Sequence, residues 1–254
     1  TGDVFRKGAP KWEEERLVYE PINRIPHQVK IDRIYAIGTK EITRAQWMLF
    51  RKPNALEDVK VTESEKIHPL EERPIVGINW YEAAAYCNWL SQQEGIPEDQ
   101  WCFQLNEQGE YAEGMKAKEN FLELQGYRLP TDAEWEFACR AGTRSKSYFG
   151  NSYYFVSQYG VISSEGKTEP AGQLKPNDKG LFDLFGNGAN WVIDLDLFRY
   201  RDEKPEKLTN PEKDRIETIL GGGLLLDRPV HRPLIDTLSR SFRGWVMSNK
   251  HARS

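Results

Sequence analysis

The most reactive side chains in this chain are its cysteines and histidines, and they are few and scattered. Cys87, Cys102 and Cys139 include no C-x-x-C pair, and three is an odd number for a disulfide framework. The chain has four histidines, at His27, His68, His231 and His251. No two of them have helical or zinc-ligand spacing, so a dedicated transition-metal site is not expected. We predict that the cysteines are small buried hydrophobes in a reducing compartment, the cytoplasm.

A second group of functional side chains lies near the C-terminus, where the residue types favour binding rather than catalysis. The stretch "LLLDRPVHRPLID", which begins at Leu224, has two Arg-Pro pairs, one histidine and two aspartates. Proline removes backbone donors and keeps the chain irregular, and Arg and Trp are enriched in binding hot spots. We therefore predict that residues 224–249 bind a protein or a small ligand. The predicted contact residues are Asp227, Arg228, His231, Arg232, Arg240, Arg243, Trp245 and Asn249.

The bulk composition describes a globular chain and argues against two classes of partner. Hydrophobic residues make up 39% and charged residues 29% of the 254 residues. The formal net charge is -4, and no clustered basic face of the kind that binds nucleic acid is evident. No apolar run is long enough to span a bilayer, so neither a nucleic acid nor a membrane is an expected partner. Residues 1–28 are polar and predict an N-terminal arm or linker, and residues 29–254 predict one domain.

The first half of the chain contains a strand signal and the clearest helix signal. The stretch "VKIDRIYAIGTKEIT" alternates apolar and polar residues as a strand does, and Thr43 then caps a short helix. Asn79 precedes a run with one buried helical face, and Glu82 stands three residues later, which is the spacing of a capping box. Residues 96–125 are an insertion of mixed polarity in which we expect a short hairpin.

The stretch "GYRLPTDAEWEFACRAG" combines a turn, a proline, a cap and spaced aromatic residues in one short run. Thr131 and Glu134 have capping-box spacing, and Trp135 faces the core. We expect Gly142 to end this helix of about two turns. After Gly142 no long helical period recurs, and short apolar pieces such as "SYYFV" predict short strands set in loops.

Five blocks of the chain occur in the order seen in one known family. They are "IGTKEITRAQW", "PIVGINWYEAAAYCNWLSQQEG", "GYRLPTDAEWEFACRAG", "KPNDKGLFDLFGN" and "ILGGG". The chain from Ile34 to Arg253 thereby resembles formylglycine-generating enzyme, also called sulfatase-modifying factor. The resemblance implies an α+β fold, an elaborated C-type-lectin-like domain with few helices, short antiparallel strands and much irregular loop. The insertion resembles a bacterial branch in which this domain is often fused to kinase or other signalling modules.

The residues that carry the family's catalysis are missing from the matching region. The family enzyme oxidises a sulfatase cysteine to formylglycine and uses two cysteines that hold copper, because soft thiolates retain Cu(I). Residues 221–254 contain no cysteine, and Gly223 replaces the serine that usually follows the two glycines. No copper is therefore expected, and the domain is predicted to be a pseudoenzyme.

A second departure concerns a structural calcium that the family binds. The family usually has Gly-Asn-x-Trp-Glu-Trp where this chain has "GNGANW". Asn187 keeps the first ligand position and Asn190 replaces the glutamate, so the resemblance implies a calcium site that has lost a charge. The alternative is that both asparagines only hydrogen-bond a turn. The family also keeps spaced arginines that pin loops, which offers a structural interpretation of Arg240 and Arg243. The family's final strand lies beyond the end of this chain, so we expect that strand to be truncated.

These departures favour a recognition domain over an enzyme. A lectin-like fold carries its ligand surface on irregular segments, which can change without disturbing the core. Variable proteins of diversity-generating retroelements use this fold and randomise this C-terminal stretch, so such a protein is one form of the hypothesis. A module of a larger signalling or defence protein is another. The alternative is an oxidoreductase of the same fold with a cysteine-independent mechanism.

Overall fold

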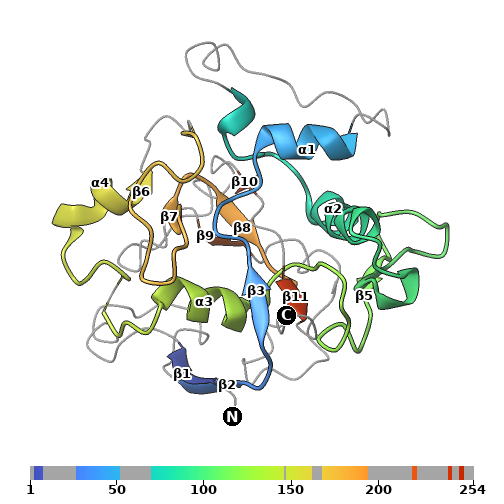
Figure 1. Cartoon of the computed structure of the whole chain (residues 1–254), viewed down its shortest axis with the longest axis horizontal. Coiled ribbons are helices and arrows are strands. Elements are labelled where there is room, and N and C mark those ends of the chain that lie inside the picture. Colours follow the sequence, from blue (N-terminus) through green and yellow to red (C-terminus); the bar gives the residue numbers. More distant parts are fainter. Residues whose placement is uncertain are drawn as a thin grey trace, which may run out of the picture.

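The computed structural model describes residues 3–7, 27–51, 70–145, 147–161, 168–193, 219–221, 240–241 and 246–248. The helices are α1 (Arg44–Arg51), α2 (Trp80–Gln93), α3 (Asp132–Arg140) and α4 (Val156–Tyr159). The strands are β1 (Asp3–Lys7), β2 (His27–Ile31), β3 (Tyr35–Ile37), β4 (Phe103–Gln104), β5 (Lys116–Ala117), β6 (Gly160–Val161), β7 (Phe185–Gly186), β8 (Ala189–Trp191), β9 (Ile219–Gly221), β10 (Arg240–Ser241) and β11 (Val246–Ser248). Short 3-10 helices occupy Leu70–Glu72, Glu98–Gln100 and Tyr153–Phe155. This is the α+β, C-type-lectin-like architecture that the resemblance implies (Figure 1).

Strand β8 lies at the centre of the described fold. It pairs with β9 on one side and β10 on the other, in a three-stranded sheet of order β10-β8-β9. Its last residue, Trp191, packs in the larger hydrophobic cluster with α1 and α2, whereas the next residue, Val192, packs in a second cluster with Trp135 of α3. Successive side chains of an extended chain point to opposite faces, so this short segment joins the two halves of the core.

Some of the strand pairs are antiparallel and others are parallel. The pairs β1–β2, β3–β11, β4–β5 and β8–β9 are antiparallel, as expected, but β6–β7 and β8–β10 are parallel. The parallel partners come from distant parts of the chain, so no hairpin turn sets their direction. The predicted hairpin in the insertion is confirmed by the β4–β5 pair.

Two other elements differ from the sequence-based expectations. The "SYYFV" stretch was expected to be a strand, but residues 153–159 form a 3-10 turn followed by α4. Strand β1 lies within the segment expected to be a polar arm and pairs with β2 along all five residues. Within the described ranges, no helix has the length and apolar character that a bilayer crossing requires.

Both predicted capping boxes are confirmed. The Asn79 side chain accepts a hydrogen bond from the Glu82 amide at 2.9 Å, and the Glu82 carboxylate accepts one from the Asn79 amide at 2.7 Å. Thr131 and Glu134 make the same reciprocal pair at 3.1 and 2.9 Å at the start of α3. At the end of α3, Ala141 is the left-handed cap, with φ of 48°, and the predicted terminator, Gly142, follows it with φ of 88°. Short helices need such caps because their own hydrogen bonds barely offset the cost of ordering them.

The carboxylate of Glu134 also anchors a buried ionic network. Arg128 donates two hydrogen bonds to it, both at 2.8 Å, and the side chains of Arg128 and Glu134 are both fully buried. Arg33 donates a third from its Nε at 2.8 Å. Burial alone would raise the pKa of Glu134, but the hydrogen bonds and charge of Arg128, the charge of Arg33 and the Thr131 amide together hold it below its usual range. The helix cap is therefore part of an ion pair that joins three segments.

Candidate functional site

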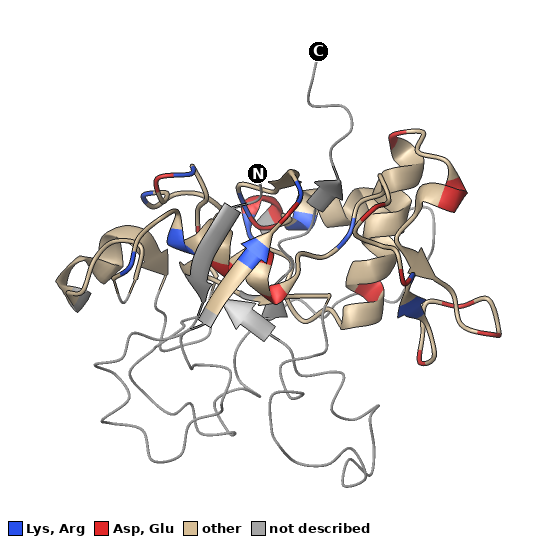
Figure 2. Ribbon diagram, turned by 90° about the horizontal axis from the view of Figure 1, so that it is seen from below, with Lys and Arg blue, Asp and Glu red and all other residues tan. Residues whose placement is uncertain are grey.

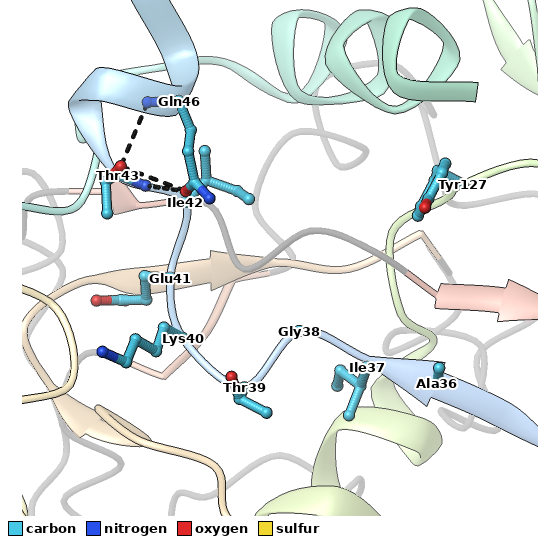
Figure 3. A pocket seen from close by; sticks show the side chains of 10 residues that line it. All are labelled: Ala36, Ile37, Gly38, Thr39, Lys40, Glu41, Ile42, Thr43, Gln46 and Tyr127. Atoms are coloured by element: carbon cyan, nitrogen blue, oxygen red, sulfur yellow. Dashed lines mark hydrogen bonds between the residues drawn. The ribbon is translucent and has the colours of Figure 1, made fainter. Parts of the chain in front are cut away.

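A pocket of about 460 Å³ opens beside the connection between β3 and α1. It is lined by residues 36–43, together with Gln46 from α1 and Tyr127 from the segment before α3. Figure 3 shows Tyr127 across the pocket from the β3–α1 connection, whereas the side chains of Lys40 and Glu41 point away from Tyr127. The volume lies in the range of small-molecule pockets.

The wall of this pocket is held at several backbone points. The Thr39 carbonyl accepts a hydrogen bond from the Phe182 amide at 2.8 Å, and the Ile42 carbonyl accepts one from the Ile75 amide at 2.8 Å. At the start of α1, the Gln46 side chain accepts from the Thr43 amide at 2.9 Å. The first two contacts come from distant parts of the chain, so the shape of the wall depends on tertiary structure as well as on the local helix start.

Glu41 connects the pocket wall to the centre of the fold. Its side chain is buried, and its Oε1 accepts a hydrogen bond from Asn190 Nδ2 of β8 at 3.1 Å. Asn190 Oδ1 in turn accepts one from Trp135 Nε1 of α3 at 3.0 Å. The result is a buried polar chain from α3 through β8 to the pocket, in which each amide atom of Asn190 has a partner.

The C-terminal strands lie directly against this site. In the β3–β11 pair, Met247 is opposite Ala36 and Val246 is opposite Ile37, and both β3 residues line the pocket. In the β8–β10 pair, Ser241 is opposite Asn190. The segment predicted to bind a partner, residues 224–249, is thus held at Ser241 beside Asn190 and, nearer its C-terminal end, at Val246 and Met247 beside the pocket wall.

Only one of the predicted contact residues belongs to the part of the chain that the structure describes. Arg240 is the first residue of β10, and its backbone pairs with Ala189. The others, Asp227, Arg228, His231, Arg232, Arg243, Trp245 and Asn249, lie outside the described residues. The sequence analysis did not identify the pocket. The Thr43-x-x-Gln46 spacing marks the helix start, but no local pattern reveals that the preceding loop faces a cavity.

The side chains of the two predicted calcium ligands already form hydrogen bonds within the fold. Asn187 has a left-handed backbone with φ of 66°, and its Oδ1 accepts a hydrogen bond from the Glu169 amide at 2.8 Å. Its Nδ2 donates to the Glu169 carbonyl at 3.1 Å, so the side chain closes a turn. Asn190 is fully buried and occupied by Trp135 and Glu41. As arranged, these amides do not fit a shared cation. Asn187 closes a turn, as the alternative interpretation has it, whereas Asn190 links two side chains of the core. Calcium binding stays a prediction.

Millimolar calcium is expected to leave the melting temperature unchanged relative to a chelator, because both asparagine oxygens already have donors. Thermal unfolding of the same sample with calcium chloride, magnesium chloride and EDTA measures this. A rise specific to calcium would instead establish the site that the resemblance implies, since a ligand that binds only the native state stabilises it.

The two buried cysteines do not offer the thiolates that copper chemistry requires. Burial raises the pKa of the Cys87 thiol well above its usual value. Burial likewise raises the pKa of Cys102 to about 11, although the charges of Arg128 and Lys118 oppose the shift. Cys102 Sγ donates to the Gly126 carbonyl at 3.3 Å. Both thiols are therefore protonated at neutral pH and shielded from substrates, and neither fits a copper site.

The sequence and the structure both have known relatives. The sequence profile of the Sulfatase-modifying factor enzyme 1-like domain matches residues 4–252. Treponema denticola variable protein 1 is similar in structure, with a TM-score of 0.60 and 26% identity over 76% of this chain and 70% of that chain. The profile match begins within strand β1 and ends beyond β11, so it includes the pocket wall and the C-terminal segment.

Two curated relatives cover smaller parts of the chain. Chaperone protein LppX of Paenibacillus barcinonensis is 26% identical over 185 residues, which are 62% of this chain and 61% of the relative. Inactive C-alpha-formylglycine-generating enzyme 2 of Bos taurus is 29% identical over 133 residues, 48% of this chain and 33% of the relative. The chain thus spans less than two thirds of either relative. Because the profile matches nearly its whole length, the chain belongs to the Sulfatase-modifying factor enzyme 1-like domain family.

Proposed function

We propose that this chain is a non-catalytic recognition domain that binds a protein or a small ligand through its C-terminal segment, residues 224–249. A relative named as an inactive formylglycine-generating enzyme and a structural neighbour named as a variable protein support a scaffold without catalysis. The absence of cysteine from residues 221–254 and the buried state of Cys87 and Cys102 support it as well.

The observation that carries the proposal is how the two ends of residues 222–239 are held. Gly221, the last residue of β9, pairs with Ala189, and Arg240, the first residue of β10, pairs with Ala189 from the other side. Neighbouring strands lie about 4.8 Å apart, so the flanking residues Gly221 and Arg240 are about 10 Å apart. Both flanking residues therefore lie at the same end of β8.

A segment closed in this way can change its side chains at little cost to the fold. The residues that flank it pair with β8, whose Trp191 packs in one half of the core while the next residue, Val192, packs in the other. Segments whose two flanking residues are held close together on a scaffold are common sites of recognition. Four of the predicted contact residues, Asp227, Arg228, His231 and Arg232, belong to this segment. A variable protein and a module of a larger signalling or defence protein are two forms of this proposal.

Alanine substitution of Asp227, Arg228, His231 and Trp245, one at a time, tests this surface. After a partner has been identified with the parent chain, at least one variant is expected to weaken its binding by roughly 30-fold, as hot-spot residues do. Arg144→Ala, an exposed arginine outside the segment, serves as the control. Melting temperatures equal to that of the parent show that each variant is folded. If all four folded variants bind as the parent does, the surface lies elsewhere.

A further inference from the structure

Arg73 is a buried arginine whose guanidinium has no partner within the described chain. Only 6% of the residue is exposed, and its buried Nε makes no hydrogen bond. Among the described residues no carboxylate forms an ion pair with it, and that includes the two preceding glutamates, Glu71 and Glu72. The contrast is Arg128, which is 0% exposed and whose Nε also lacks a hydrogen bond, but whose two other guanidinium nitrogens both donate to Glu134.

An unpaired guanidinium in such a position is costly. Removing a cation from water is unfavourable by several kcal/mol unless an anion and hydrogen bonds replace the lost hydration. Lysine or histidine could escape this cost by releasing a proton, but arginine keeps its charge in proteins. The position of Arg73 is therefore suited to an anion that approaches from outside the described chain.

The backbone around Arg73 is firmly placed. Its carbonyl accepts a hydrogen bond from the Arg44 amide at 2.8 Å, at the first residue of α1. The preceding carbonyl, that of Glu72, accepts one from the Ala171 amide at 2.9 Å. The neighbouring residue, Pro74, bridges Thr43 of the pocket wall. Arg73 thus belongs to a rigid junction between α1, the segment before α2 and the turn at Ala171.

A second cation lies against the same turn. The side chain of Lys40 packs directly on Gly172. If a Cβ atom were added at this glycine, it would lie 2.3 Å from the lysine Cε. Its Nζ lies 5.5 Å from the centre of the Phe182 ring and forms no ion pair with a described carboxylate. Lys40 is exposed, so it can attract an anion from solvent towards this junction.

The segment that follows α2 offers no such environment. Residues 94–123 contain eight acidic and two basic residues, and the eight acidic residues are exposed. Figure 2 colours acidic residues red and basic residues blue along the ribbon. Lys118, one of the two basic residues, donates to the backbone carbonyls of Glu98 and Asp99 at 3.2 and 3.0 Å. An anionic ligand is therefore repelled by residues 94–123.

We propose that Arg73, with Lys40 packed on Gly172 of the turn that bonds the preceding residue, Glu72, contributes to a binding site for an oxyanion, either a carboxylate or a phosphate group. The planar fork of a guanidinium matches two oxygens of such a group, and the ammonium adds a point charge. The proposal is independent of the recognition surface formed by residues 224–249, because it rests on different residues.

Thermal unfolding of the parent chain in sodium phosphate, sodium acetate and sodium chloride at equal ionic strength tests this site. The parent is expected to melt about 2–5 °C higher in at least one of the two oxyanions than in chloride. The salt that raises the melting temperature identifies the ligand group as phosphate or carboxylate. Equal melting temperatures in all three salts would overturn the proposal, whatever the variants do.

Three variants connect the effect to the residues. Arg73→Met keeps most of the apolar packing, so its melting temperature in chloride is expected to equal or exceed that of the parent. The oxyanion is expected not to raise the melting temperature of this variant. Arg73→Lys keeps the charge without the fork and is expected to bind at least ten-fold more weakly. Arg144→Met, the surface control, is expected to respond as the parent does. A lower melting temperature of Arg73→Met in chloride, or an undiminished rise in Arg73→Lys, would contradict the assignment.

Discussion

Replacing Arg128 with methionine is expected to lower the free energy of unfolding by about 3–5 kcal/mol, because the change leaves Glu134 buried with one of its two arginine partners gone. The two hydrogen bonds of 2.8 Å between these side chains lie where neither group can reach water. Arg33 remains, but its side chain is 24% exposed and cannot replace a paired, fully buried guanidinium. Urea denaturation followed by tryptophan fluorescence measures the loss.

The pH dependence of this loss of stability distinguishes the contribution of the ion pair from that of side-chain packing. The pKa of Glu134 is lower in the folded state than in the unfolded chain, where it is about 4.3. The stabilisation that the ion pair gives the fold is therefore fully present above about pH 4.3. This stabilisation is lost as the pH falls through the lower pKa that Glu134 has in the folded state. The difference between parent and Arg128→Met is therefore expected to be largest near pH 7 and to shrink below about pH 4.

An exposed ion pair provides the matched control for Arg128. Lys30 and Asp32 lie 2.6 Å apart, with side chains that are 57% and 65% exposed. Lys30→Met is expected to change stability by less than about 0.5 kcal/mol, because solvent already screens that pair. A comparably small effect for Arg128→Met, or one that does not vary with pH, would show that the buried network does not stabilise the fold as described.

Trp135→Ala is the second change with a large expected effect, a loss of about 3–5 kcal/mol. The Trp135 side chain is 3% exposed and packs in a cluster with Leu181, Leu184 and Val192, so its removal leaves a cavity. The change also removes the donor to Asn190 Oδ1, which lies at 3.0 Å. Chemical denaturation monitored by far-ultraviolet circular dichroism measures the loss.

Trp135→Phe divides the effect into its two parts. Phenylalanine retains most of the buried area but cannot donate to Asn190, so the expected loss is about 1–3 kcal/mol, the usual cost of leaving a buried acceptor unsatisfied. Because Asn190 also holds Glu41 of the pocket wall, hydrogen exchange of residues 38–43 is expected to speed up in this variant. Unchanged exchange there would mean that the polar chain from α3 does not support the pocket.

The sequence by itself determined the elements that depend on neighbouring residues. The capping boxes at Asn79 and Thr131 are interactions between residues three apart, so their spacing was enough to predict both helix starts. The burial of Trp135 followed from helical periodicity. The family, too, could be identified from five ordered blocks. Where the local signal was ambiguous the prediction was wrong: the "SYYFV" aromatics suit a strand or a short helix, and the structure has the helix.

Only the tertiary structure decided how distant residues meet. Residues 221 and 240 both pair with Ala189, Ile37 meets Val246, and Asn190 joins Trp135 to Glu41. Each contact joins segments that no turn or cap links, so no local pattern encodes it. The same holds for the missing partner of Arg73: a charged residue after two glutamates looks solvated in the sequence, and only the packing around it shows that it is buried.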